Sequence, residues 1–213
     1  MNYAPEGYVS VLSTAYFFPI TALLEKLTPL KLNEPNEVQT SNIDNGYSVS
    51  IIVLSVLLLE SAIGRTQFVQ NKQPPMRPVE FVASEYPQSG FSDKIEELFV
   101  VRDVIAHNHL WEAQFQWDDQ LGMKFVSPPV LRSGYGDPKF RRVIDPSDRT
   151  TRLLGINLFP TRIHRADATI VLKTTVEFLL FLQSQNKSYT YMSPSTVRFN
   201  GEAVSFVDLV ANL

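Results

Sequence analysis

Hydrophobic side chains recur at the spacing of an amphipathic α-helix in four long segments of the chain. These segments are residues 9–30, 48–68, 92–109 and 167–185. Pro19 interrupts the first segment and predicts a kink or a division into two helices there, because proline lacks the backbone N–H that a helix interior needs. Asp167 is placed to cap the last segment. The pattern therefore predicts a mainly α-helical fold.

After the third helical segment, hydrophobic residues recur at every second position. Polar and apolar residues alternate from Trp111 to Trp117, and a turn is favoured shortly afterwards, so we expect a β-hairpin over about 111–126. A second hairpin is expected at 197–206. Its Asn200-Gly201 pair is typical of the type I′ turn that joins two antiparallel strands. The fold class is thus mainly α, with β-hairpins as a minor addition.

The other stretches are rich in residues that favour loops. Residues 31–46 are predicted to form a polar loop, and residues 70–90, which contain four prolines, an extended connector. Residues 128–160 are rich in proline, glycine and charged residues and predict a long loop with a short strand at 140–144. We expect a single domain over residues 1–213, in which residues 112–164 are a candidate β-rich subdomain.

The composition excludes several classes of protein. The chain has 213 residues, 44% of them hydrophobic, which is ample for a core. The absence of cysteine excludes disulfides, thiolate chemistry and cysteine-type zinc sites. The longest apolar run, Val49 to Leu59, is shorter than the roughly 20 residues of a membrane-spanning helix, and the N-terminus does not resemble a secretory signal. We expect a cytoplasmic protein without membrane association.

Basic residues are concentrated in one part of an acidic chain. The net charge is -3, yet residues 122–173 contain ten Lys or Arg against four Asp or Glu, which leaves the remainder strongly acidic. Such a segment has two interpretations. It is a surface that binds phosphates, or it consists of solvated loops whose arginines pair with the acidic remainder.

A polar cluster interrupts the third helical segment. Asp103 and His107 are four positions apart, about 40° round an ideal helix, so the carboxylate is expected to hold one imidazole nitrogen. Arg102 is about 140° from His107 and does not share its face within one helix. Glu60, an acid among core positions of the second segment, is expected either to pair with Arg65 or Arg102 or to face water.

Sequence motifs exclude the commonest hydrolases and NTPases. The chain has no Gly-x-Ser-x-Gly elbow, no Walker loop and no zinc-protease signature. His107 and His109 lie on roughly opposite faces of a helix and cannot hold one metal ion together. His164 is expected to be a surface histidine. We therefore expect neither a metal site nor a cofactor.

The sequence Arg102-Asp-Val-Ile-Ala-His107 resembles the Arg-x(4–6)-His motif of the HEPN superfamily of all-α domains. The preceding Leu57-Leu-Leu-Glu-Ser-Ala-Ile-Gly-Arg65 is similar to the second helix of bacterial HEPN proteins. The resemblance covers roughly residues 9–111 and extends to the helix from Asp167. It implies a HEPN-like helical bundle. This chain departs from the family at Asp103, where many members have asparagine.

Many HEPN proteins are metal-independent endoribonucleases that dimerise so that two copies of the motif meet in one cleft. The resemblance implies that His107 relays a proton while a ribose 2′-hydroxyl attacks the adjacent phosphate. It also implies that Arg102 stabilises the phosphorane and that Asp103 orients His107. The remaining candidates for contacts with RNA are Asn108, His109, Arg141 and Arg142. The partners implied are a second copy of the chain, an RNA substrate and a cognate antitoxin or regulatory protein.

Two alternatives to catalysis remain open at this stage. The first alternative is that Arg102, Asp103 and His107 form a polar network that only specifies how the helices pack. A HEPN fold without catalysis would instead serve as a dimerisation or ligand-binding module in a larger system. A basic dimer cleft favours the nuclease, whereas an occluded or acidic cleft favours the scaffold. Resemblance to toxin-type members implies a toxin–antitoxin or phage-defence setting.

Overall fold

The helices of the protein dominate its computed structural model, which describes residues 15–31, 37–72, 74–107, 110–120, 122–132, 138–185 and 192–213. Seven α-helices lie in these residues, together with eight short strands, so the prediction of a mainly α fold is confirmed. The helices are α1 (Phe17–Leu27), α2 (Asn42–Val69), α3 (Pro78–Glu85), α4 (Ser92–His107), α5 (Pro138–Val143), α6 (Arg165–Gln185) and α7 (Phe206–Ala211).

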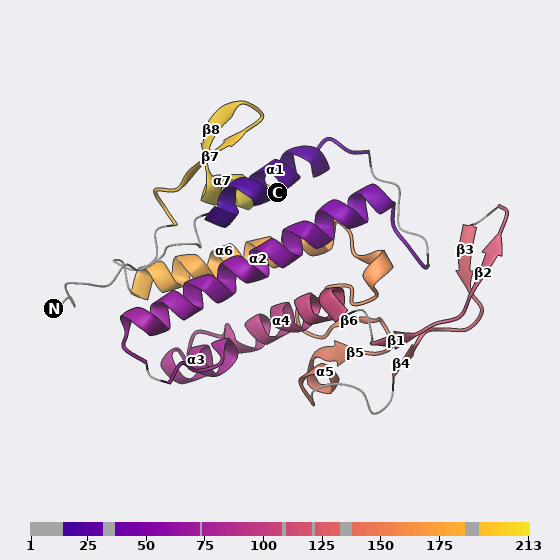
Figure 1. The fold of residues 1–213 in the computed structure, drawn as a ribbon, viewed down its shortest axis with the longest axis horizontal. Coiled ribbons are helices and arrows are strands. Elements are labelled where there is room, and N and C mark those ends of the chain that lie inside the picture. Colours follow the sequence, from indigo (N-terminus) through magenta and orange to yellow (C-terminus); the bar gives the residue numbers. More distant parts are fainter. Residues whose placement is uncertain are drawn as a thin grey trace.

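Helix α2 is the centre of the bundle (Figure 1) and packs against α1, α3, α4 and α6. Its side chains Ile52, Val56, Leu59 and Ile63 are fully buried, as their spacing predicts. Burial of one such side chain stabilises a fold by about 1.5–3 kcal/mol. One continuous hydrophobic cluster contains residues from all seven of these helices. The short helices α5 and α7 are therefore part of the same packed body as the long ones.

The length and composition of α2 also satisfy the criteria for a membrane-spanning helix, with a mean hydropathy of 1.9 over its most apolar window. Half of that window is buried inside the fold. The central helix of a helical bundle is expected to have this composition, because neighbouring helices surround it on several sides.

Helix α2 begins six residues earlier than the hydrophobic pattern predicted. Ser41 caps it by accepting a hydrogen bond from the backbone N–H of Asp44 at 3.1 Å. The side-chain amide of Asn45 then donates to the carbonyl oxygens of Pro160 and Ile163, at 2.8 and 2.9 Å. The prediction of a loop up to residue 46 was therefore wrong, since the cap and these long-range contacts hold the polar first turns in a helix.

Prolines occupy positions in these helices where they cost little. Pro78 is the first residue of α3, and Pro19 is the third residue of α1. Backbone N–H groups in the first turn have no intrahelical acceptor, so proline loses nothing there. The prediction of an extended connector over 70–90 was wrong for α3. The expected first helix begins at Phe17 in the described residues, and its residues 9–14 lie outside them.

Four antiparallel strand pairs complete the fold. The strands are β1 (Trp111–Glu112), β2 (Phe115–Asp118), β3 (Gly122–Phe125), β4 (Val130–Leu131), β5 (Ile144–Asp145), β6 (Thr150–Thr151), β7 (Thr196–Phe199) and β8 (Glu202–Ser205). Their pairs are β1 with β4, β2 with β3, β5 with β6, and β7 with β8. The β7–β8 hairpin is confirmed, and both residues of its turn, Asn200 and Gly201, have the positive φ of a type I′ turn.

The hairpin expected over 111–126 is confirmed only for its outer part. Strands β2 and β3 pair with each other, whereas Trp111 pairs with Leu131 of β4. The short strand predicted at 140–144 is wrong for residues 140–143, which form the end of α5, and Ile144 begins β5.

Residues 112–164 are fixed to α4 by a buried carboxylate. Glu97 is 4% exposed, and its two oxygens accept the backbone N–H groups of Leu153 and Leu154 at 2.7 and 2.8 Å. The indole of Trp111 adds a bond to the carbonyl oxygen of Leu158 at 2.9 Å. A buried carboxylate is stable only with such donors. These bonds hold the strand-rich segment, and with it α5, against the helical bundle.

Candidate functional site

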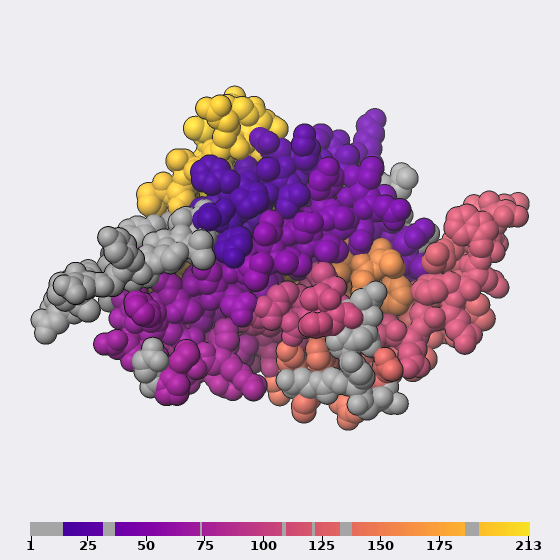
Figure 2. All heavy atoms as spheres, in the orientation of Figure 1, coloured from indigo at the N-terminus to yellow at the C-terminus, as the bar shows by residue number. Residues whose placement is uncertain are grey.

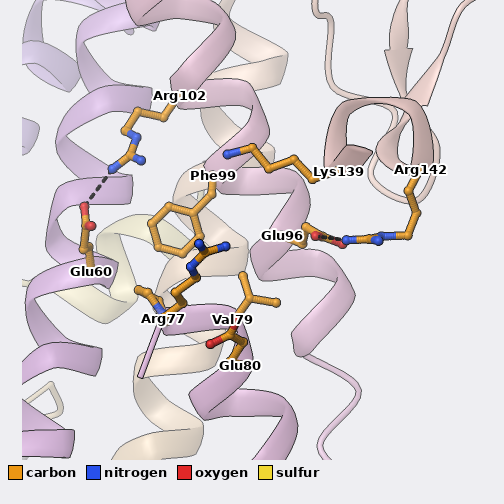
Figure 3. A pocket seen from close by; sticks show the side chains of 10 residues that line it. Glu60, Arg77, Val79, Glu80, Glu96, Phe99, Arg102, Lys139 and Arg142 are labelled. Carbon is orange, nitrogen blue, oxygen red and sulfur yellow. Dashed lines mark hydrogen bonds and ion pairs between the residues drawn. The ribbon is translucent and has the colours of Figure 1, made fainter. Parts of the chain in front are cut away.

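A cavity of about 490 Å³ lies among α2, α3, α4 and α5, beside Arg102 and Asp103 of the polar cluster on α4. Its charged lining residues are Glu60, Arg77, Glu80, Glu96, Arg102, Lys139 and Arg142. Figure 3 shows these side chains around the apolar ring of Phe99. Four cations and three carboxylates face one space. The cavity is thus a charged site in which most cations have an acidic neighbour.

Arg102 is held at this cavity by two carboxylates. Its Nη1 lies 2.7 Å from Oε2 of Glu60, and its Nε and Nη2 donate to Oδ1 of Asp103 at 3.1 and 2.9 Å. The guanidinium also lies over the ring of Phe99, 5.1 Å from the centroid, where a cation–π attraction adds to the ion pairs. Glu60 therefore pairs with Arg102, as one interpretation expected, while its side chain also stays 43% exposed to water.

Asp103 bridges α4 to α5. Its Oδ2 accepts from Nζ of Lys139 at 2.5 Å while its Oδ1 accepts from Arg102. Burial favours the neutral acid, but the hydrogen bonds and charges of Lys139 and Arg102 outweigh it and lower the pKa of the Asp103 carboxyl below its ordinary value. We expected Asp103 to hold His107. Both of its oxygens are instead engaged by these two cations, because α5 brings a lysine to the carboxylate.

His107 is the last residue of α4 and is exposed. Arg102 lines the cavity and His107 is not among its lining residues, as expected for side chains about 140° apart on one helix. Asn108 and His109, two candidates for contacts with RNA, lie outside the described residues. One copy of the chain therefore does not place the guanidinium and the imidazole around the same space.

The two arginines predicted to contact a substrate differ in position. Arg142 lines the cavity, and its Nε donates to Oε2 of Glu96 at 3.0 Å while its Nη2 contacts Oε1 of the same carboxylate. Arg141 is exposed and is not a lining residue. Two cavity cations, Arg77 and Lys139, were not predicted. The basic character of residues 122–173 could have indicated Lys139. Nothing indicated Arg77, because residues 70–90 were expected to form an extended connector.

The cavity is suited to anions that can replace a carboxylate. Among the described residues, Arg77 has no carboxylate within ion-pair distance, and its guanidinium faces the cavity (Figure 3). A phosphate that entered beside Arg77 could take over the contact of Arg102 with Glu60, since guanidinium groups bind phosphate and carboxylate in the same bidentate way. Within the described part of the chain, no three His, Asp or Glu side chains are grouped as metal ligands.

His164 has a structural position at the start of α6. Its Nδ1 lies 2.7 Å from Oδ2 of Asp167, which also accepts the backbone N–H of His164 at 2.9 Å. The hydrogen bond to Asp167 raises the pKa of His164 above its ordinary value, although burial opposes this. The side chain of His164 is 26% exposed, so it reaches the surface as expected, but it also has a structural contact with Asp167 that the sequence did not indicate. Helix α6 begins two residues before Asp167, which was expected to cap it, and Asp167 accepts the backbone N–H of His164 from within the first turn.

A scan against protein-family models and searches among curated proteins and solved structures find no match for this chain. The two segments that resemble the HEPN superfamily lie on α4 and on α2, which pack against each other. The ion pair between Arg102 and Glu60 joins one segment to the other.

Proposed function

We propose that this protein is a metal-independent endoribonuclease of the HEPN type. The observation that carries the proposal is the end of α4. There Arg102 faces a cavity that three other cations line, and His107 follows as an exposed imidazole. These two groups supply a phosphate-binding charge and an imidazole that can accept and donate a proton.

The reaction uses the RNA itself as the nucleophile. The imidazole of His107 accepts the proton of a ribose 2′-hydroxyl, and the 2′-oxygen forms a bond to the adjacent phosphorus. The bond between phosphorus and the 5′-oxygen of the next nucleotide breaks, and that oxygen leaves with a proton from an imidazolium. The products are a 2′,3′-cyclic phosphate and a 5′-hydroxyl. Arg102 stabilises the charge on the phosphorane.

A second copy of the chain is needed to bring an imidazole to the guanidinium, and the outward face of α2 supports such a dimer. The residues of this outer stripe are partly or fully exposed and recur every three or four positions: Gly46, Ser50, Val53, Leu57, Ser61 and Gly64. Figure 2 shows atoms of α2 at the surface between α1 and α4. Glu60, the partner of Arg102, adjoins the stripe. We propose a two-fold axis at this stripe, which would bring the two copies of Arg102 toward each other.

The glycines of this stripe support the same conclusion. A Cβ added at Gly46 or Gly64 would meet no atom within 4 Å, so packing within one chain does not require glycine at either position. Glycine in a helix costs about 1 kcal/mol relative to alanine. A helix from a second copy that packs closely against α2 would explain these two glycines, because the absence of a side chain lets two helices approach each other.

The reaction products test the proposal most directly. Purified protein should cleave single-stranded RNA in the presence of EDTA, leave 2′,3′-cyclic phosphate ends, and spare a substrate with a 2′-deoxyribose at the cleaved position. Cleavage that needs added divalent metal would overturn it. We further propose that the enzyme acts in the cytoplasm in a toxin–antitoxin or phage-defence system with a cognate antitoxin. Expression in cells should then inhibit growth, and His107→Ala should relieve the inhibition.

A second candidate function is a non-catalytic ligand-binding module of the same fold. The observation that favours it is the double neutralisation of Arg102 by Glu60 and Asp103. A guanidinium with two carboxylate partners is less available to a scissile phosphate. Protein that forms dimers and binds an anionic ligand at the cavity, but leaves RNA intact at every pH and salt concentration, would favour this module over the nuclease.

A further inference from the structure

The β2–β3 hairpin projects from the end of the helical bundle (Figure 1) and has one apolar face. Its register pairs Phe115 with Phe125 and Trp117 with Met123, so these four side chains lie on the same side. Phe115 is 44% exposed and Trp117 is 71% exposed. An apolar face with an exposed tryptophan is typical of a surface that binds a partner.

The root of the hairpin is fixed by a cluster of three phenylalanines. The ring centroids of Phe115 and Phe125 are 5.3 Å apart, and that of Phe125 is 5.3 Å from the buried Phe159. Edge-to-face and tilted ring pairs of this kind stabilise by about 0.5–1.5 kcal/mol beyond their buried area. The apolar face is therefore held against the body at Phe159, while Trp117 lies two residue pairs further along the hairpin.

A guanidinium without an acidic partner accompanies these rings. The Cζ of Arg149 lies 5.6 Å from the ring centroid of Phe125, and its backbone is held between Asp145 and Leu158 by hydrogen bonds of 2.9 and 2.8 Å. Its Nε is buried and has no hydrogen-bond partner. No carboxylate in the described residues lies within ion-pair distance of Arg149, whereas the cations of the same basic segment at the cavity have such partners.

We infer that this face of the hairpin, with Phe115 and Trp117 on it and Arg149 beside it in the turn between β5 and β6, is a binding platform for single-stranded RNA. Unpaired bases stack on exposed aromatic rings, and an unneutralised guanidinium attracts the phosphates between them. The charge of Arg149 fits a polyanion and gives an apolar protein partner no advantage. The inference rests on the proposed function, since it names how the substrate of that reaction is held.

The position of the platform suits this role. Phe115 follows His107 by eight residues, so the two lie no more than about 29 Å apart, even if the chain between them were fully extended. An RNA strand that stacks on the hairpin is long enough, with a few nucleotides, to reach the end of α4. The platform would thus bind the strand on one side of the scissile phosphate.

The test is binding of a fluorescent single-stranded RNA, measured by anisotropy with His107→Ala protein so that the RNA stays intact. Trp117→Ala should weaken binding by about 5- to 150-fold, the loss expected for one stacked base. Trp117→Tyr should retain most of the affinity because it keeps a ring. Gln116→Ala, on the opposite face of the same strand, and Phe18→Ala, an exposed aromatic on α1, should bind as the parent does.

A second readout reports from the platform itself. The chain has two tryptophans, so in Trp111→Phe protein the fluorescence comes from Trp117 alone and should be quenched by the RNA strand but much less by an RNA duplex. Circular dichroism of each variant checks that the fold is retained. Unchanged affinity of Trp117→Ala, or no binding by the parent protein, would overturn the inference.

The result also separates the inference from the proposed function. RNA binding that depends on Trp117 in a protein that never cleaves RNA would support the platform and overturn the nuclease. RNA cleavage by a protein whose affinity does not depend on Trp117 would do the opposite. A change of oligomeric state in Trp117→Ala, with RNA affinity unaffected, would assign the face to a second copy of the chain.

Discussion

Arg102 of α4 and Glu60 of α2 form an ion pair of 2.7 Å between Nη1 and Oε2 at the edge of the cavity. Their side chains are 25% and 43% exposed, so water screens the pair and its contribution to stability is small. Its effect on ligands is expected to be larger, because a phosphate must compete with Glu60 for the same guanidinium.

We predict that Glu60→Gln tightens RNA binding and changes the free energy of unfolding by less than about 1 kcal/mol. The amide keeps the shape of the side chain and removes the competing charge. The KM for RNA and a urea unfolding curve measure the two effects. Glu80→Gln is the matched control, since Glu80 lines the same cavity without an ion pair among the described residues. An equal effect of both variants would assign the change to net charge alone.

The Glu60 pair illustrates what the sequence reveals about this site. An acid at a core position of an apolar helix needs a partner, and Arg102 was one of two candidates named from that reasoning. Lys139 was not foreseen, although it binds Asp103, which lies 36 residues earlier in the chain. Local pattern carries no information about a contact of that range.

The short elements were harder to predict than the long ones for a related reason. Residues 138–143 are too few to distinguish a helical period from a strand period, so α5 was interpreted as part of a strand. The prolines before α3 suggested a connector, yet one of them begins the helix. The long α2, α4 and α6 give several turns of consistent pattern, so the presence of these three helices was predictable.

Asp103→Asn should reduce stability at neutral pH by about 1–3 kcal/mol, because it removes the charge that Arg102 and Lys139 share in a partly buried site. The pKa of Asp103 is lower in the folded protein than in the unfolded chain. Its contribution to stability is therefore present above the unfolded pKa, about 3.9, and is lost as the pH falls through the folded pKa. Unfolding curves from pH 7 to pH 3 should show a smaller acid-induced loss in the variant. An equal loss of stability with falling pH in the parent and in Asp103→Asn would contradict a stabilising charge on Asp103.

His164 should give a pH dependence of opposite sign. Its pKa is raised in the folded protein by Asp167, so the stabilisation is fully present below the unfolded pKa, about 6.5, and is lost as the pH rises through the folded pKa. We expect the melting temperature at pH 6 to exceed that at pH 8, and the difference to shrink in His164→Gln. His107→Gln, at the exposed end of α4, is the matched histidine control. If the melting temperatures at pH 6 and pH 8 differ by the same amount in His164→Gln and in the parent, the contact of His164 with Asp167 is not the source of the pH dependence.

Gly64→Leu should disrupt the proposed dimer while leaving each chain folded. The position is exposed with open space around it, and leucine favours a helix more than glycine does. Forcing a large side chain into a close helix contact costs about 1–3 kcal/mol, which raises the dimer dissociation constant roughly 5- to 150-fold. Sedimentation measures that constant, and Ser184→Leu, an exposed position near the end of α6, controls for the added apolar surface. If Gly64→Leu remains a dimer of unchanged affinity, the interface lies elsewhere.

His107→Ala should abolish RNA cleavage without affecting the fold, because the side chain is exposed at the end of α4. General acid–base catalysis contributes about 10²- to 10⁴-fold in rate, so the loss should be plain in a single-turnover assay. Circular dichroism and the melting temperature should match those of the parent protein. Cleavage at the parent rate by His107→Ala would show that the imidazole takes no part and would leave the ligand-binding module as the better account.

Arg102→Lys is the sharper test of how the phosphate is held. Lysine keeps the positive charge but lacks the planar guanidinium with its several donors. In the observed geometry it can bind the carboxylate of Glu60 or that of Asp103, but not both. Activity well below the parent value indicates a phosphate bound by both guanidinium nitrogens, whereas near-parent activity indicates that a positive field suffices. The melting temperature must be measured in parallel, since Arg102 also connects α4 to α2. The double variant Glu60→Gln with Arg102→Lys separates the structural role of Arg102 from its role toward RNA. In the Glu60→Gln background the ion pair between α4 and α2 is already absent. Any further loss of cleavage in the double variant, relative to Glu60→Gln alone, therefore comes from the contact with RNA.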